Sequence, residues 1–192
     1  NEADTLEVCV TKAQQALRDG KITGLRIKTY AGLGAYLSTI APGVATTLYG
    51  RIVTGVYKIP NVHIDVIATY TNTAMVDAYR GAGRPEAAYV VERLVDACAR
   101  KLSMSPDAIR RKNFIQPDQF PYATITGANY DSGDYEKALN QALVESGYKE
   151  LRAEQKRRID SKSNKVLGIG ISSYVEVTAP LGLFSEYGKV TV

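Results

Sequence analysis

Hydrophobic and polar residues alternate along the beginning of the chain. Residues 6–11 carry apolar side chains at every second position, and residues 25–29 resume this alternation after the dipeptide Asp19-Gly20. A period of two is typical of a strand with one buried face, and Asp-Gly favours a tight hairpin turn. The pattern predicts a β-hairpin, followed by a bend at the glycine-containing residues 32–36.

A second alternating stretch follows residue 60. His63 and Asp65 lie on its polar side, so we expect solvent exposure there rather than a ligand role for the histidine. Its apolar side consists of Val62, Ile64, Val66, Ala68 and Tyr70. Between the hairpin and this strand, residues 42–57 are consistent with a helix that two glycines interrupt.

The most strongly helical pattern begins at Pro85, since proline at a first helical position loses no hydrogen bond. Apolar residues then recur at three- and four-residue steps and form one stripe. The predicted inward residues are Ala88, Val91, Leu94, Val95, Cys98 and Leu102. The predicted outward residues are Glu86, Glu92, Arg93, Asp96 and Arg100.

Five further elements complete the pattern. They are a helix from Pro106 capped by Ser105, a loop at 117–132, a helix from near Asp134 to Gly147, an exposed helix and turn at 149–163, and a strand at 166–177. Strands and helices do not follow a repeating βαβ order. The predicted fold class is therefore α+β, with a mixed sheet and helices packed on one face.

The composition is that of an ordinary globular chain of 192 residues, with 45% hydrophobic and 23% charged residues. These values exclude collagen-like, disulfide-scaffold and strongly disordered classes. No apolar run approaches the roughly 18 residues that a membrane helix requires, so we expect no membrane partner. One histidine and two distant cysteines leave too few ligands for a zinc site. We expect reduced thiols, no metal ligand and a cytoplasmic location.

The net charge of +4 is a mild excess. Its basic residues cluster at 110–112 and 156–158, with acidic residues close by. The mixed signs favour solvated helix faces or a partner surface, and we expect no nucleic-acid partner. Nucleic acid is the alternative, and a steep salt dependence of DNA binding would distinguish it.

The most unusual local chemistry lies in residues 78–86. Gly81 and Gly83 permit positive φ angles and let backbone N–H groups face a ligand. The start of the following helix adds partial positive charge, and Arg80 and Arg84 add full charges. This combination predicts a site for an oxyanion, a phosphate or a metal-oxo group. The alternative is a tight turn with two surface arginines.

Several stretches together resemble a known family. They are Thr71-Asn-Thr73, Ala78-Tyr-Arg-Gly-Ala-Gly-Arg-Pro-Glu-Ala87, Glu92-Arg-Leu-Val-Asp96 and Ile109-Arg-Arg-Lys-Asn113, with further matches at 19–26, 34–38, 168–172 and 174–176. They closely resemble the molybdenum-cofactor-binding large subunit of the xanthine dehydrogenase, aldehyde oxidase and carbon monoxide dehydrogenase-like hydroxylases. The matches keep the family's order over nearly the whole chain.

The resemblance implies that residues 1–192 are one internal fragment of the molybdopterin-binding domain. The chain starts without methionine and ends within the strand-like residues 185–192, which also indicates a fragment. The expected organisation is strand-rich at 1–75, a motif loop at 76–84, helical at 85–160 and strand-rich at 164–192.

The resemblance also implies which residues form the site. Tyr79, Arg80, Gly81, Ala82 and Gly83 would line the cofactor pocket beside the molybdenum, and Arg80 would be the catalytic residue as an electrostatic orienter. Gly81 stands where copper-containing carbon monoxide dehydrogenases carry a copper-binding cysteine. Ala82 stands where xanthine oxidoreductases carry a phenylalanine against the purine. Both differences argue against those two substrates and leave an aldehyde or an N-heterocycle.

The implied cofactor is molybdenum-molybdopterin, in its cytosine dinucleotide form. The implied reaction is an aldehyde, N-heterocycle or carbon monoxide dehydrogenase-like oxidation with water as oxygen source. Iron–sulfur and FAD-binding subunits or domains would be partners in a heteromeric enzyme. The family's glutamate base lies far downstream, so Glu86, Glu92 and Glu176 do not take that role. We therefore expect the isolated fragment to hold no cofactor and to be inactive.

Two alternatives to a molybdenum hydroxylase are open from the residues alone. One is a non-catalytic anion- or nucleic-acid-binding module that uses Arg80, Arg84 and the basic clusters. The other is a plain structural or oligomerisation domain, which a protein-only ion pair at a buried Arg80 would favour.

Overall fold

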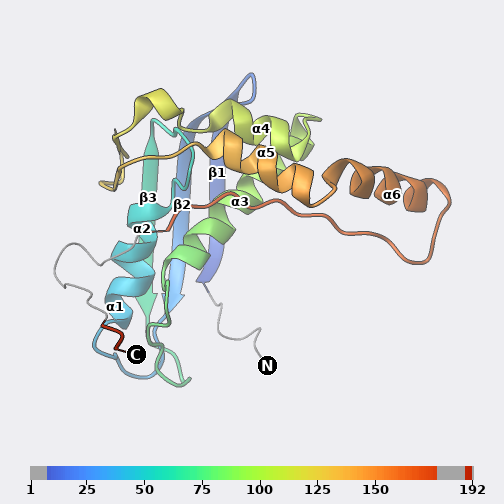
Figure 1. Ribbon diagram of the computed structural model, residues 1–192. Coiled ribbons are helices and arrows are strands. Elements are labelled where there is room, and N and C mark those ends of the chain that lie inside the picture. Colours follow the sequence, from blue (N-terminus) through green and yellow to red (C-terminus); the bar gives the residue numbers. More distant parts are fainter. Residues whose placement is uncertain (1–7, 177–188, 192) are drawn as a thin grey trace.

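The computed structural model describes residues 8–176 and 189–191, and its centre is a mixed three-stranded sheet (Figure 1). Strand β1 (Val8–Arg18) runs antiparallel to β2 (Lys21–Gly32), and β2 runs parallel to β3 (Val62–Thr69). The turn residues Asp19 and Gly20 have φ angles of 51° and 78°. Positive φ at both turn residues is what a tight hairpin requires, so the predicted hairpin is confirmed.

Parallel strands need a crossover, and a helical segment provides it between β2 and β3. This segment consists of α1 (Ala41–Gly43), the π-helical turn η2 (Val44–Leu48) and α2 (Tyr49–Ile52). The helix ends earlier than the sequence predicted. Gly55 adopts a φ of 55° in the turn that follows, a conformation that does not continue a helix.

One face of the sheet forms the main core. Ile27 and Thr29 of β2 are fully buried, and Ile27 packs in one cluster with Val53 and with Val91 of α3 (Arg84–Lys101). Helices α2 and α3 lie over this face (Figure 1). The opposite face is polar; its exposed residues include Lys28, His63 and Asp65. The mixed α+β class, with helices on one face, is confirmed. Ala68 is exposed, and Tyr70 lies beyond β3 and is 68% exposed, so the predicted inward place of both residues was wrong.

Helix α3 buries part of the predicted stripe, while Ala88 and Leu94 are only half-buried. Val91, Val95 and Cys98 are buried as expected. Leu102 is 39% exposed, because it lies past the end of the helix. Glu92 was predicted to face solvent, but only 5% of its surface is exposed.

The burial of Glu92 is explained by a partner on α4 (Pro106–Asn113). The fully buried guanidinium of Arg110 donates to Glu92 Oε2 through Nη2 at 2.8 Å and Nε at 3.1 Å, and to Asp96 Oδ1 at 2.9 Å. The hydroxyl of Tyr57 donates to Glu92 as well. Burial, with the Glu92 carboxylate next, raises the pKa of Tyr57 well above its usual range. A buried charge is tolerated here because it is paired and hydrogen-bonded.

The basic cluster at 110–112 is therefore not one solvated face, as its sequence suggested. Arg110 lies in the core, whereas Arg111 reaches Asp107 at 3.6 Å and Glu136 at 3.1 Å near the surface. Ser105 occupies the N-cap position of α4, but its side chain makes no capping hydrogen bond.

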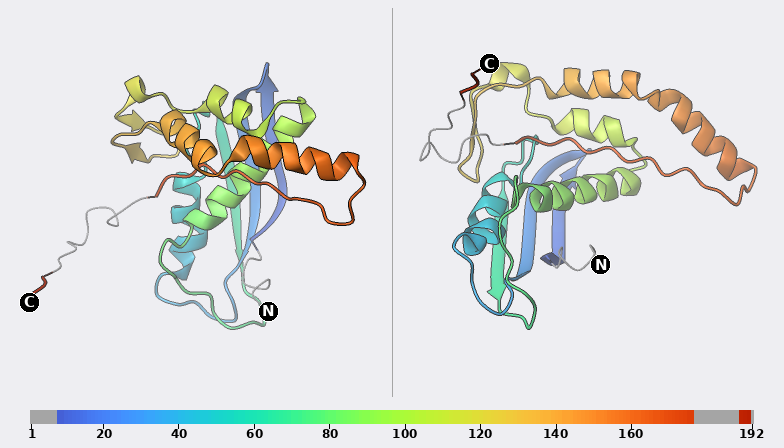
Figure 2. Two further views of the ribbon diagram at one scale, coloured as in Figure 1. Left: turned by 45° about the vertical axis from the view of Figure 1, so that its right-hand side comes forward. Right: turned by 60° about the horizontal axis from the view of Figure 1, so that its bottom comes forward.

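The second half of the chain adds short elements and two helices. They are η3 (Pro117–Gln119), β4 (Tyr122–Ala123), β5 (Asn129–Tyr130), α5 (Tyr135–Glu145) and α6 (Tyr148–Asp160). Asp134 caps α5 by accepting from the Lys137 N–H at 3.0 Å, and Gly147, with a φ of 62°, ends that helix as predicted. No residue of α6 is buried, and the helix projects from the body (Figure 2).

After α6 the chain returns alongside it to the body as an extended segment (Figures 1 and 2). Residues 164–176 form no strand, because no neighbouring strand pairs with them in the described part of the chain. The predicted strand at 166–177 was therefore wrong for residues 166–176. Val177 and residues 185–188 and 192 lie outside the described residues, and residues 189–191 form no strand.

Candidate functional site

The carboxyl ends of the parallel strands β2 and β3 lie at the same end of the sheet, where ligand sites of open α/β sheets usually form. The chain segments that leave these strands are hydrogen-bonded to each other. Ala35 N donates to Thr73 O, and Thr71 N donates to Gly34 O, both at 3.0 Å. Gly34 allows this contact, because a Cβ there would lie 2.4 Å from Ala74 O. Two stretches that carry the family resemblance, 34–38 and 71–73, thus meet in space.

The motif loop, residues 76–84, continues from this end of the sheet to the start of α3. Two turns shape it: Ala82 N donates to Tyr79 O at 2.9 Å, and Arg84 N donates to Gly81 O at 3.0 Å. Tyr79 is 86% exposed and Arg80 is exposed. Arg80 makes no hydrogen bond or ion pair with the residues that the structure describes. Its guanidinium is therefore available to a ligand.

The two glycines of the loop have different surroundings. Both have positive φ angles, 85° at Gly81 and 89° at Gly83. A Cβ at Gly83 would meet Val44 O at 2.9 Å and Tyr49 N at 3.0 Å, so this glycine packs against the crossover helix. A Cβ at Gly81 would meet only Glu176 Oε2, at 3.7 Å. The open backbone of the loop is therefore at Gly81.

Replacing each glycine by alanine should separate these two environments. We expect Gly81→Ala to destabilise the protein by about 1–2 kcal/mol, because only the left-handed backbone is strained. Gly83→Ala should cost roughly 2–4 kcal/mol, because a backbone clash adds to the same strain. Urea unfolding of both variants measures the difference. Equal losses of stability would contradict the packing role of Gly83.

Arg84 is held by the protein itself. Its Nε lies 3.2 Å from Glu176 Oε1, and its Nη1 donates to Ala82 O at 3.1 Å. The Arg84 side chain is 17% exposed, so of the two arginines predicted at this site, Arg84 has a structural partner. Glu176 belongs to the returning segment and was missed as a neighbour of the loop. The only sequence signal for it was the matched stretch 174–176.

The loops around the site also expose large apolar side chains. Ser38 Oγ donates to Asp77 Oδ1 at 3.0 Å and ties the two flanking loops together. The exposed apolar residues on these loops are Tyr36, Leu37, Ile40, Met75 and Tyr79. Several exposed apolar groups beside one another usually mark a surface that further protein or a ligand covers.

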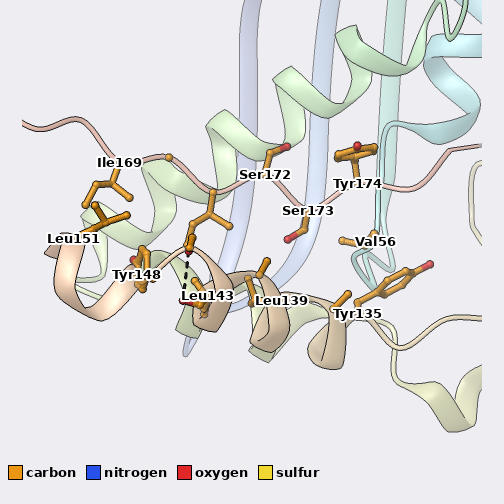
Figure 3. Close-up of a pocket in the computed structure, with 15 residues that line it drawn as sticks. Val56, Tyr135, Leu139, Leu143, Tyr148, Leu151, Ile169, Ser172, Ser173 and Tyr174 are labelled. Atoms are coloured by element: carbon orange, nitrogen blue, oxygen red, sulfur yellow. Dashed lines mark hydrogen bonds between the residues drawn. The ribbon is translucent and has the colours of Figure 1, made fainter.

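A separate cavity of about 470 Å³ lies between α5, α6 and the returning segment (Figure 3). Leu139, Leu143 and Leu151 line it from the helices, and residues 169–174 line it from the segment. Its lining holds no carboxylate, histidine or cationic side chain, so the cavity is uncharged and mainly apolar. The motif loop is not part of it.

A molybdenum cofactor fits the motif loop on the geometry of these residues. Arg80 and the N–H group of Gly81, which makes no hydrogen bond within the described chain, can donate to oxygens of such a group. In the described residues, no three His, Cys, Asp or Glu side chains come together as a metal site. No helix there is long and apolar enough to span a membrane.

At the ends of its parallel strands, the mixed sheet presents a glycine loop whose Arg80 has no partner in the part of the chain that the structure describes. This arrangement suits a domain that binds an oxygen-rich cofactor. Residues 10–114 match the family described as the molybdopterin cofactor-binding domain. Since this match covers more than half of the 192 residues, the chain belongs to that family.

Sequence and structure comparisons with known proteins support this family assignment. The chain is 44% identical over 165 residues to the carbon monoxide dehydrogenase large chain of Hydrogenophaga pseudoflava, covering 84% of this chain and 20% of that protein. Among solved structures, a Cu,Mo-carbon monoxide dehydrogenase in its carbon monoxide-reduced state matches with a TM-score of 0.68 and 39% identity, over 77% of this chain and 19% of that one. Quinoline 2-oxidoreductase from Pseudomonas putida 86 matches with a TM-score of 0.68 and 30% identity, over 74% and 18%. The chain thus spans about one fifth of the length of these relatives.

Proposed function

We propose that this chain is part of the catalytic large subunit of a molybdopterin-dependent oxidoreductase. The observation that carries the proposal is an exposed Arg80, without a partner among the described residues, beside the open α-carbon of Gly81 in a domain of the molybdopterin-binding family. When bound, the molybdenum centre supplies the two-electron redox chemistry. The protein supplies position and electrostatic field.

The motif loop would do this with few residues. Arg80 donates to an oxygen of the cofactor and holds its charge and orientation, which suits a planar guanidinium. Tyr79, Gly81 and Ala82 form the adjoining wall, and Gly83 keeps the loop against the crossover helix. Arg80 is the one catalytic residue that we assign in this chain.

The substrate that we propose is an aldehyde or an N-heterocycle. The relatives named above act on carbon monoxide and quinoline by their names. The loop at 76–84 contains no thiol, and Cys98 is buried on α3, so this loop offers no soft ligand for copper. A copper-dependent oxidation of carbon monoxide is therefore not the reaction that we propose.

The intact enzyme would be heteromeric, with iron–sulfur and FAD-binding subunits or domains that carry the electrons away. The name "large chain" of the first relative supports further subunits. The cytosine dinucleotide form of the cofactor and a cytoplasmic location stay predictions from the sequence.

The isolated 192-residue chain should contain no molybdenum, because one loop forms only a small part of a cofactor pocket. We call the complete large subunit, of which we propose that this chain is a part, the longer protein. Purified in the same way, it should contain about one molybdenum per catalytic chain, because we expect a single cofactor site. Elemental analysis of both preparations measures this. A longer protein without molybdenum or pterin would refute the proposed function.

The structure weakens the alternative of an anion- or nucleic-acid-binding module, because two of the arginines near its proposed surface are paired. Arg110 is buried in an ion pair, and Arg84 is paired with Glu176, so fewer cations face solvent than the sequence suggested. A titration with generic DNA at two salt concentrations tests it. Strong, steeply salt-dependent binding by the longer protein would favour that alternative.

A further inference from the structure

The returning segment has the geometry of a strand although no strand pairs with it. Burial alternates strictly along residues 167–176. The half-buried residues are Leu167, Ile169, Ile171, Ser173 and Val175, and the exposed ones are Gly168, Gly170, Ser172, Tyr174 and Glu176. In Figure 3, Ser173 points toward α5, whereas Ser172 and Tyr174 point away from it. A period of two with one face on the core is the pattern of a half-buried strand.

One edge of this segment is satisfied by the buried ion pair. Arg110 Nη2 donates to Ile171 O at 2.8 Å, and Ser173 N donates to Glu92 Oε2 at 2.9 Å. In an extended chain, residues two apart direct their backbone groups to the same edge. The backbone groups of the odd-numbered residues thus face Arg110 and Glu92, and these two hydrogen bonds hold this edge of the segment in place.

The other edge is open. The backbone N–H and C=O groups of Gly168, Gly170, Ser172 and Tyr174 make no hydrogen bond within the described chain. The outer face of the segment is open as well, because a Cβ at Gly168 or Gly170 would meet no atom of the described chain within 4 Å. A fixed strand with one unpaired row of backbone groups is a template for a further strand.

We propose that residues 167–176 are an inner strand of a larger sheet, and that an apolar strand from another part of the same, longer polypeptide pairs with its open edge. The similar large chain is about five times as long as the matched stretch, so most of such a polypeptide lies outside these residues. The uncharged cavity beside the segment, with Leu139, Leu143 and Leu151, is suited to the apolar side chains of the added strand.

Hydrogen exchange of the longer protein tests this pairing without reference to the cofactor or to activity. We expect the amides of Gly170, Ser172 and Tyr174 to exchange at least about a thousand-fold more slowly than unbonded amides. The Ser173 amide, bonded to Glu92, is the internal reference for a protected amide in this segment. Fast exchange at the even-numbered amides beside a slow Ser173 would overturn the proposal.

The source of the added strand is tested with the catalytic chain expressed alone and diluted in steps. Protection that persists assigns the strand to the same polypeptide. Protection that disappears on dilution indicates a second copy, and protection that needs the other subunits indicates one of them; either result overturns our assignment.

A matched pair of variants makes the test specific. Ser172→Pro removes one N–H of the open edge and should abolish the protection at Gly170 and Tyr174, since proline cannot donate to a ladder. Ser172→Ala keeps that N–H and should preserve the protection. Equal behaviour of the two variants would contradict strand pairing at this edge.

Discussion

Replacing Arg110 by alanine is expected to destabilise the protein by about 3–5 kcal/mol, because it leaves a buried carboxylate without its partner. Glu92 is only 5% exposed, and Arg110 supplies two of its hydrogen bonds. The change also removes the donor to Ile171 O, so the returning segment should loosen. Urea unfolding measures the loss of stability, and proteolysis between residues 164 and 176 measures the loosening.

Arg111 is the matched control, one position further along α4. Its ion pairs with Asp107 and Glu136 are partly exposed, so Arg111→Ala should cost at most about 1 kcal/mol. Replacing Glu92 and Arg110 together by leucine and methionine should cost much less than the two single changes summed. A loss for Arg110→Ala no larger than that for Arg111→Ala would show that the buried pair does not support this core.

Replacing Arg80 by alanine in the longer protein is expected to lower kcat/KM by about 10²–10³-fold, the usual effect of removing one charge-stabilising donor from an active site. The fold should be unaffected, since Arg80 is exposed and has no partner in the described chain. Thermal unfolding should therefore match the unmodified protein. Steady-state kinetics with an aldehyde and an N-heterocyclic substrate measures the loss.

Two further variants distinguish orientation from charge. Arg80→Lys keeps the charge but loses the planar donor pair, so it should recover only part of the activity. Arg84→Lys changes a residue that is already paired with Glu176, so it should affect turnover much less than Arg80→Ala. Full turnover in Arg80→Ala, with molybdenum still bound, would remove Arg80 from the catalytic machinery.

The sequence predicted elements whose cause is local. The hairpin follows from alternation and Asp19-Gly20, and most of the α3 stripe follows from three- and four-residue spacing. The end of α5 follows from Gly147. In each case the residues that determine the structure are close together in the chain, so a pattern read along it contains the information.

The errors concern partners that are distant in the chain. The helical periodicity predicted an outward Glu92, and the mixed charges around residues 110–112 predicted a solvated Arg110. Both predictions follow from the rule that charged residues are seldom buried alone. The pairing of Glu92 with Arg110, across 18 residues and two helices, makes burial possible. Likewise, the alternation at 166–176 was read correctly as extended chain, but strand pairing depends on a second strand that the described residues do not include.

The motif loop shows both what the sequence predicts and what it misses. Its glycines have the positive φ angles that the sequence suggested. The sequence could not show that Gly83 packs against Val44 and Tyr49 while Gly81 stays open, or that Glu176 pairs with Arg84, because these contacts join segments far apart in the chain. The cofactor-binding role of residues 79–83 stays a prediction.

In the function that we propose, the motif loop faces the molybdenum through Gly81 and Arg80. The most direct test is a crystal structure of the longer protein with anomalous scattering recorded at the molybdenum absorption edge. We expect one molybdenum peak on the open side of Gly81, with the Arg80 guanidinium directed to the oxygens of the cofactor. A peak remote from this loop, or none in a fully folded protein, would contradict this proposal.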